Sequence, residues 1–303
     1  MAIYVVIPIA IYMWKYRVSS WVRVLDQSIL NGLVYMERAA TGIKGFDELI
    51  ESGFPKGASI LLTGPPGSGK SIFSMQYLYN GAINGENGVY VYMDSPLDIL
   101  KEQAKQLGMD FEKLEKDGKV TFVHVPLTKR KFDLFYSIED AVKKIGAKRL
   151  VFDSLPSFVI NMDLFTIPAA YAGAAASTVS TSRDLIATNS SALAASPKQE
   201  GDKVVYKGDE DKRLISIIID QLRRLETTNI IVTFAGVDSN QISSDGVSEF
   251  ICDGIINLGL ADVGGGPSRL LKIIKMRTTK NELDFHNFEI TKNGIVVESK
   301  EGK

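Results

Sequence analysis

The feature that most constrains this chain is an apolar run, Ser59 to Thr63, that leads directly into a glycine-rich segment and then into a helical pattern. The glycine-rich segment reads Gly64-Pro65-Pro66-Gly67-Ser68-Gly69-Lys70-Ser71. Its glycines allow the backbone to curl so that successive N–H groups point at one anion. The helix expected over Lys70 to Ala82 would direct its positive dipole end at the same anion. Strand, glycine loop and helix together form the P-loop pattern, which predicts a site for a nucleoside triphosphate.

Two side chains of the P-loop and one carboxylate elsewhere complete the predicted chemistry. Lys70 is expected to reach the β- and γ-phosphates of ATP, and Ser71 is expected to ligate Mg²⁺. Asp153 ends a second apolar run that begins at Arg149, where a carboxylate can hold the magnesium shell opposite Ser71. An aspartate at the end of a strand is common, so the metal-binding role of Asp153 is predicted mainly from its position in the chain relative to the P-loop. The sequence therefore predicts ATP and Mg²⁺ as cofactors.

Apolar runs alternate with helical patterns along the first half of the chain, which is typical of a parallel sheet with helical crossovers. Besides those already named, strands are expected over Val89 to Asp94 and Val120 to Val125. A helix capped by Ser95 should run from Pro96 to Leu107, and another should cover Asp133 to Ile145. We expect an α/β fold in which helices flank a mostly parallel twisted sheet.

The second half of the chain is less regular. Residues from about 159 to 211 form a long insertion rich in alanine, serine and threonine. After it a helical pattern resumes at Leu214. Three further strands are expected over Asn229 to Ala235, Ile251 to Leu258 and Arg269 to Lys275. A closing hairpin is expected from two short strands, Phe288 to Ile290 and Gly294 to Val297.

The domain organisation expected is an apolar N-terminal extension, residues 1–35, followed by one domain, residues 36–303. The run from Ala2 to Trp14 is shorter than the roughly 20 apolar residues of a spanning helix and contains Pro8. Three interpretations stay open: an added strand or helix, a weak membrane anchor, or an upstream extension before a start at Met36. We do not expect the protein to act at a membrane.

Composition excludes several classes of protein. The formal net charge is −1, which gives no general attraction to nucleic acid or anionic lipid. Cys252 is the single cysteine and only two histidines are present, so neither a disulfide framework nor a Cys/His zinc site can be built. These features fit a cytoplasmic protein.

A series of motifs in order resembles the KaiC-like branch of the RecA superfamily, over about residues 40–297. The motifs are Thr41-Gly42-Ile43-Lys44-Gly45-Phe46-Asp47, Gly53-Phe54-Pro55-Lys56-Gly57, the P-loop, Ala147-Lys148-Arg149, Asp253-Gly254-Ile255-Ile256, Lys275-Met276-Arg277 and His286-Asn287-Phe288-Glu289-Ile290. The resemblance implies a RecA-like ATPase core that forms hexameric rings or filaments, with ATP between neighbouring subunits. Of these we expect a homo-oligomeric ring, a hexamer. It also makes Thr41 a candidate nucleotide-binding residue.

The resemblance further implies catalytic roles for three residues. Lys275 and Arg277 match a basic pair that reaches the γ-phosphate of the neighbouring subunit and would stabilise charge on the transferring group. Asp94 matches a position that orients the attacking water. The family usually has two adjacent carboxylates there, whereas this chain has one. The strand after the insertion offers Thr233 alone as a polar γ-phosphate sensor. These departures make ATP binding a firmer expectation than rapid hydrolysis.

Three functions are therefore weighed: a slow Mg·ATP hydrolase, an ATP-binding switch or scaffold with a protein partner and little turnover, and a recombinase paralogue that binds single-stranded DNA. A strand-binding loop needs basic residues for phosphates and aromatic residues for bases. The resemblance implies that Gly236 to Glu249 is the second of two loops that face the central pore of the ring. This loop has no basic residue. Nucleic-acid binding is therefore the least favoured of the three.

Overall fold

The computed structural model describes residues 37–93, 96–125, 134–161, 208–235, 241–263 and 266–298. The chain divides into two units, Met1–Glu37 and Arg38–Lys303, and the account below concerns the second. The predicted extension, most of the predicted insertion, Asp94 and Ser95 lie outside the described residues. Within the described residues, no helix has both the length and the apolar character needed to cross a bilayer.

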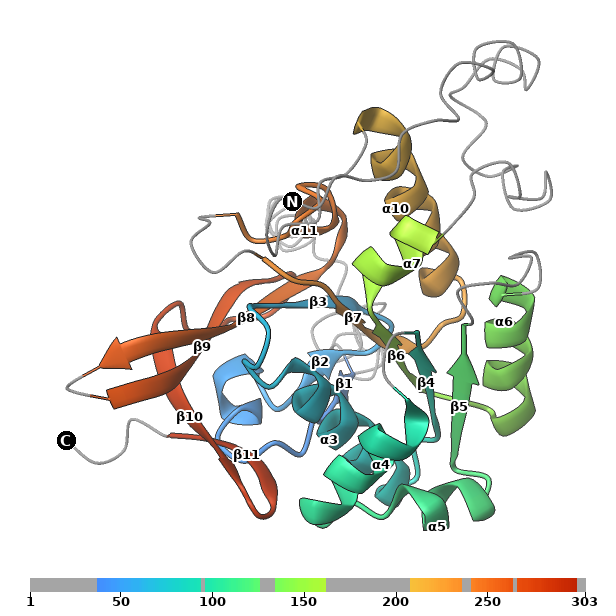
Figure 1. Cartoon of the computed structure of the whole chain (residues 1–303), viewed down its shortest axis with the longest axis horizontal. Helices are drawn as coiled ribbons and strands as arrows, with labels where there is room; N and C mark the ends of the chain where they lie inside the picture. The colour runs from blue at the N-terminus through green and yellow to red at the C-terminus, as the bar shows by residue number, and fades with distance from the viewer. Residues whose placement is uncertain are drawn as a thin grey trace, which may run out of the picture. The chain divides into compact units, whose positions relative to one another are not determined.

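In the described part of the chain, nine strands form one sheet in the order β11-β10-β9-β8-β3-β7-β6-β4-β5 (Figure 1). Six of them run parallel: β3 (Ser59–Thr63), β4 (Gly88–Tyr92), β5 (Val120–His124), β6 (Arg149–Asp153), β7 (Thr228–Val232) and β8 (Gly254–Val263). Three antiparallel strands extend the sheet beyond β8: β9 (Gly266–Met276), β10 (Phe285–Thr291) and β11 (Gly294–Val297). The predicted α/β fold is confirmed.

Helices cover both faces of the parallel part of the sheet (Figure 1). One layer contains α3 (Lys70–Ile83), α4 (Leu97–Gln106) and α5 (Phe111–Lys116), and the other contains α6 (Leu134–Ile145), α7 (Leu155–Asn161) and α10 (Gly208–Arg223). Alternate strand residues enter two separate cores: Leu62 lies in the core that contains Phe73 of α3, and Leu61 lies in the core that contains Ile218 of α10. Because both faces are buried, the parallel strands are continuous apolar runs.

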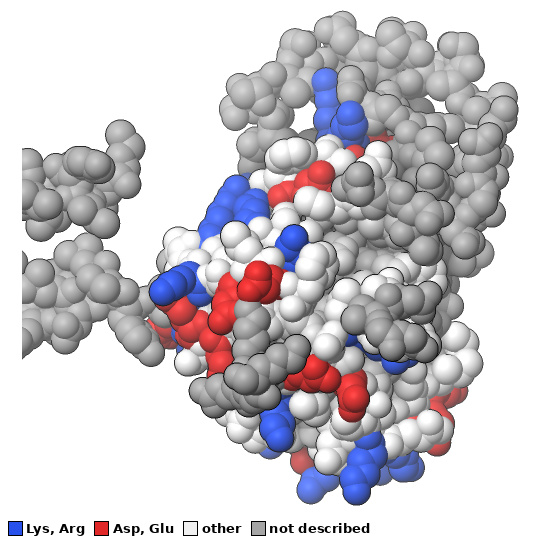
Figure 2. Space-filling view, turned by 90° about the vertical axis from the view of Figure 1, so that its left-hand side faces the viewer, with Lys and Arg blue, Asp and Glu red and all other residues white. Residues whose placement is uncertain are grey.

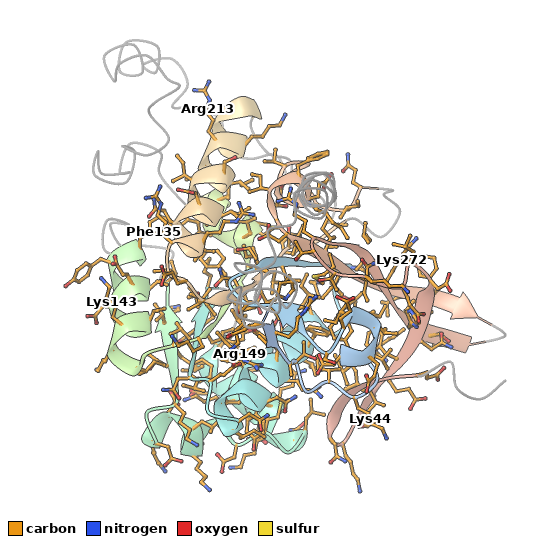
Figure 3. The ribbon with its side chains drawn as sticks, turned by 180° about the vertical axis from the view of Figure 1, so that it is seen from behind. Lys44, Phe135, Lys143, Arg149, Arg213 and Lys272 are labelled. Carbon is orange, nitrogen blue, oxygen red and sulfur yellow. The ribbon has the colours of Figure 1, made fainter. Side chains whose placement is uncertain are left out.

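A small sheet of β1 (Arg38–Ala39) and β2 (Phe54–Pro55) lies at the start of the described unit. A 3-10 helix, η2 (Asp47–Ile50), lies between these two strands in the sequence. Arg149 links this region to the main sheet (Figure 3), because its guanidinium donates to the carbonyl of Ala40 at 2.7 Å.

Several predicted boundaries are wrong, and each error has a local cause. Pro96 is the N-cap of α4 rather than its first helical residue, since its ψ of 132° is extended. Helical structure extends into both ends of the predicted insertion, because α7 runs to Asn161 and α10 begins at Gly208. Cys252 follows the short helix α11 (Ser248–Ile251) and does not belong to a strand, although its thiol is buried as predicted. The helix α5 was not predicted.

Candidate functional site

The P-loop joins the carboxyl end of β3 to the amino end of α3, and its glycines adopt backbone angles that other residues avoid. Gly64, Gly67 and Gly69 have φ values of 146°, 77° and 102°. A Cβ atom on Gly64 would lie 2.0 Å from the carbonyl oxygen of Leu258 in β8. Gly64 is therefore required both by its backbone conformation and by the neighbouring strand. The loop is held against the sheet, with α3 beginning directly at Lys70.

The Lys70 ammonium group lies within the curve of this loop. Its Nζ donates to the carbonyl oxygens of Gly64 at 2.8 Å and Pro65 at 2.9 Å. Burial lowers the pKa of Lys70 to about 8, and the nearby Asp153 carboxylate opposes this decrease. A partly desolvated cation at a helix N-terminus is well suited to bind an anion.

Three side chains from three elements meet beside the loop. Ser71 Oγ of α3 donates to Asp153 Oδ2 of β6 at 3.1 Å, and Tyr90 Oη of β4 donates to the same oxygen at 2.6 Å. Burial and the Asp153 carboxylate together raise the pKa of Tyr90 well above its usual value, so the phenol stays protonated. The structure thus brings Ser71 and Asp153 together, as the sequence predicts, and adds Tyr90, which the sequence analysis missed.

Two buried hydroxyl groups near the loop make no hydrogen bond in the described structure: Ser68 Oγ within the loop and Thr233 Oγ1 after β7. Thr233 lies beside the end of β3, since its N–H donates to the Leu62 carbonyl at 2.9 Å. A buried hydroxyl normally has a partner. Two such groups at one end of the sheet fit a site for a polar ligand with oxygen acceptors, such as a triphosphate.

The donor set also fits magnesium. Mg²⁺ in phosphate sites keeps several waters and takes one or two protein groups together with phosphate oxygens. Ser71 and Asp153 supply a hydroxyl and a carboxylate of this kind. No group of three or more His, Cys, Asp or Glu side chains that could hold a metal was found among the described residues. The residues present therefore fit an ion that is held jointly with a nucleotide.

Thr41 lies away from this arrangement in its own chain, and its role in nucleotide binding stays a prediction. Its hydroxyl and its N–H both donate to Asp47 Oδ1, at 2.7 and 2.9 Å, and its carbonyl accepts from Asn80 at 2.9 Å. Asn80 is ten residues along α3 from Lys70, or about 15 Å at the helical rise. Thr41 stabilises a turn near the far end of that helix.

Lys275 and Arg277 lie at the opposite end of the central strands from the P-loop. Lys275 of β9 pairs with Ile255, near the start of β8, and Arg277 N–H donates to the Asp253 carbonyl at 2.8 Å. Asp253 is in turn bonded to Ser59, the first residue of β3. The five residues of β3 span about 16 Å. The basic pair is therefore remote from the P-loop of its own chain.

Both basic side chains are held in place by their surroundings. Lys275 Nζ donates to the carbonyls of Glu249 at 3.1 Å and Cys252 at 2.8 Å. Burial, followed by the neighbouring Arg277, lowers the pKa of Lys275. Arg277 forms an ion pair with Asp253 Oδ1 at 3.2 Å, while about half of its side chain stays exposed (51%). Both basic groups are therefore bonded within their own chain, and the Arg277 side chain is the more exposed of the two.

The described part of the predicted second loop, residues 241–249, is closed by its own hydrogen bonds. Asp245 Oδ1 accepts from the N–H groups of Val247 at 2.7 Å and Ser248 at 2.6 Å, and Ser243 Oγ donates to Glu249. This loop presents carboxylates rather than cations. On the molecular face in Figure 2, lysine and arginine side chains of the described residues are interspersed with aspartate and glutamate, without one broad basic area.

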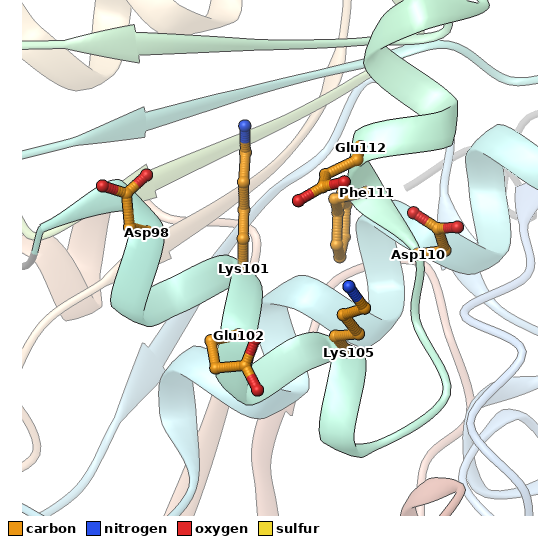
Figure 4. A pocket seen from close by; sticks show the side chains of 7 residues that line it. All are labelled: Asp98, Lys101, Glu102, Lys105, Asp110, Phe111 and Glu112. Carbon is orange, nitrogen blue, oxygen red and sulfur yellow. The ribbon is translucent and has the colours of Figure 1, made fainter.

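A groove of about 250 Å³ lies between α4 and α5, away from the residues discussed so far (Figure 4). Its lining has four carboxylates and two lysines: Asp98, Lys101, Glu102, Lys105, Asp110, Phe111 and Glu112. None of the predicted site residues lines it. A groove with an excess of carboxylates does not suit a phosphate ligand.

Comparisons with known proteins show what this chain is similar to. A family profile described as "ATPase: KaiC" matches residues 39–164 and 207–302. A UPF0273 protein of Aeropyrum pernix is 33% identical over 278 residues, covering 86% of this chain and 94% of that protein. The circadian clock protein KaiC3 of Synechocystis is 29% identical, and the match covers 86% of this chain but 46% of KaiC3.

A solved structure also matches. The crystal structure of the KaiC-like protein PH0186 of Pyrococcus horikoshii aligns with a TM-score of 0.65 and 32% identity, covering 88% of this chain and 100% of that one. The profile leaves out residues 165–206, which lie within the predicted insertion. The matched segments include the P-loop, Asp153 and the basic pair.

Proposed function

Because this chain belongs to the KaiC family of ATPases, we propose that it binds Mg·ATP at the P-loop and hydrolyses it slowly at an interface between two subunits. The observation that carries the proposal is the convergence of Lys70, Ser71 and Asp153 at one end of the sheet. Backbone N–H groups and Lys70 bind the phosphates, and Ser71 and Asp153 hold the magnesium. A magnesium ion held by Ser71 and Asp153 would supply positive charge to offset the charge that develops on the transferring phosphoryl group.

The placement of the basic pair supports the proposed interface. Lys275 and Arg277 are about one strand length from the P-loop of their own chain, so they can reach the γ-phosphate only in a second copy. A head-to-tail arrangement repeats this contact, and we propose that its rotation closes into a ring. The pair then stabilises the charge of the transferring group from outside. Asp94 is proposed to orient the attacking water.

The first test addresses nucleotide binding. Lys70→Ala should abolish binding of a fluorescent ATP analogue, because the loop loses the cation that its carbonyls hold. Lys148→Ala, at an exposed lysine before β6, is the matched control and should bind as the wild type does. Unchanged affinity in Lys70→Ala would refute the site.

The second test addresses the shared interface. Asp94→Ala and Arg277→Ala proteins should each hydrolyse little ATP alone. In an equal mixture, about a quarter of the interfaces of a head-to-tail ring would join an intact P-loop side to an intact basic pair. We expect about a quarter of wild-type ATPase activity in the mixture. Arg269→Ala, at an exposed residue of the same strand, is the control. Absence of any recovery would contradict a shared site.

An ATP-binding switch with little turnover is the second candidate. It is favoured by the sequence Thr233-Phe234-Ala235 after β7, which provides one hydroxyl as a phosphate sensor. In that case a protein partner would respond to the bound nucleotide. Steady-state ATPase measurements distinguish the two: turnover that is lost in Asp94→Ala supports the hydrolase, and turnover equal to background supports the switch.

A further inference from the structure

Tyr90 places a phenol hydroxyl inside the central sheet, where an apolar side chain would be expected. The residue is fully buried in β4, and its ring packs against Phe122 of β5 with centroids 5.8 Å apart. A phenylalanine would fill the same space with no polar atom to satisfy. The hydroxyl therefore calls for an explanation beyond packing.

The strand register explains how Tyr90 reaches Asp153. Tyr90 pairs with Val151 of β6, and Asp153 is two residues further along the same strand. Residues two apart project from the same face of a strand, so Asp153 is the diagonal neighbour of Tyr90. Long aromatic side chains can reach such a neighbour. The Oη–Oδ2 distance of 2.6 Å is that of a strong hydrogen bond to a carboxylate.

We propose that Tyr90 is a positioning residue that holds the Asp153 carboxylate in the orientation required for Mg²⁺ binding with the nucleotide. This inference rests on the proposed function. Asp153 Oδ2 accepts from both Tyr90 and Ser71, on two different elements. The Tyr90 bond comes from a residue fixed in the core, whereas Ser71 is itself a proposed metal ligand. Tyr90 can therefore keep the carboxylate oriented when Ser71 turns to the metal.

The test compares Tyr90→Phe with Tyr77→Phe. Tyr77 is the matched control, since it is also fully buried and its hydroxyl donates one hydrogen bond, to the Thr228 carbonyl at 3.0 Å. Binding of the non-hydrolysable analogue mant-AMPPNP is measured by fluorescence while Mg²⁺ is titrated, and again in EDTA. Melting temperatures of both variants report the cost of losing a buried hydroxyl.

Tyr90→Phe should raise the half-saturating Mg²⁺ concentration about tenfold or more, the usual effect of losing a group that orients a metal ligand. Its affinity in EDTA should equal that of the wild type, because the phosphate cradle is intact. Tyr77→Phe should leave the Mg²⁺ dependence unchanged. Added to Asp153→Asn, Tyr90→Phe should cause no further loss, since Tyr90 acts through Asp153.

Two results separate the inference from the proposed function. If the wild type binds mant-AMPPNP in a Mg²⁺-dependent manner and Tyr90→Phe has the same half-saturating Mg²⁺ concentration, the positioning role is refuted while the nucleotide site stands. If the wild type binds no analogue at any Mg²⁺ concentration, both are refuted. An equal change in Tyr77→Phe would show a general effect of core hydroxyls and would also overturn the inference.

Discussion

Replacement of Arg149 by methionine should strongly destabilise the protein without touching the nucleotide site. The Arg149 side chain is 3% exposed and forms an ion pair with Glu86, with guanidinium–carboxylate distances of 2.8 and 2.6 Å. It also donates to the carbonyl of Tyr77 at 2.8 Å and lies over the Tyr77 ring, 4.6 Å from its centroid. Methionine can fill much of the space but can donate none of these bonds.

The magnitude follows from what is left behind. Breaking a buried ion pair by removing one partner costs about 3–5 kcal/mol. Glu86 keeps a 25% exposed side chain, so water reduces the penalty on the carboxylate and favours the lower half of that range. The orphaned carbonyl of Tyr77, which lies in the core, adds to the cost. For a domain of this size, about 3 kcal/mol corresponds to a decrease in melting temperature of roughly 6–12 °C.

The assay is urea unfolding and thermal melting of the full chain, with Lys148→Met as the control. Lys148 is the preceding residue and is exposed, so its replacement should change stability by less than about 0.5 kcal/mol. In a double-mutant cycle with Glu86→Gln, the two losses should be non-additive, because the two side chains share the interaction. A loss below about 1 kcal/mol in Arg149→Met, or full additivity with Glu86→Gln, would refute the assigned role of the ion pair.

Three further outcomes are expected. Gly64→Ala should abolish binding of the ATP analogue, because the alanine Cβ would lie 2.0 Å from the Leu258 carbonyl oxygen. Retained binding would contradict the argument that the backbone requires glycine at this position. The affinity for Mg·AMPPNP should change little below pH 7.5 and fall about fivefold between pH 8 and 9, because Lys70, with a pKa of about 8, must be protonated to bind the anion. A flat profile to pH 9 would exclude this. Asp253→Asn should lower kcat about 10- to 100-fold, because Asp253 holds Arg277 in position. Nucleotide affinity should stay unchanged, because Asp253 and Arg277 are remote from the P-loop of their own chain. An altered affinity would contradict this remote placement.

Local patterns predicted much of the fold. The strands Ser59–Thr63 and Arg149–Asp153 were predicted at their observed bounds, because each is a buried apolar run. The closing hairpin was predicted from its Asn293-Gly294 turn, and it is present as the antiparallel pair β10 and β11. The helix α5 was missed because its six residues are too few to show a helical repeat of apolar residues. Asp110 caps it by accepting from the Lys113 N–H at 3.1 Å.

The chemistry of the P-loop was determined by the sequence itself, because its glycines, Lys70 and Ser71 are contiguous and act through local backbone geometry. Other features depend on the tertiary structure, since they arise where distant segments meet. The register of β4 against β6 places Tyr90 on Asp153, and the antiparallel pairing of β9 with β8 carries Arg277 away from its own P-loop. The contact between Asn80 of α3 and the Thr41 carbonyl places the family motif that contains Thr41 near the far end of that helix. Contacts of this kind depend on pairings between residues far apart in the chain, which no local pattern encodes.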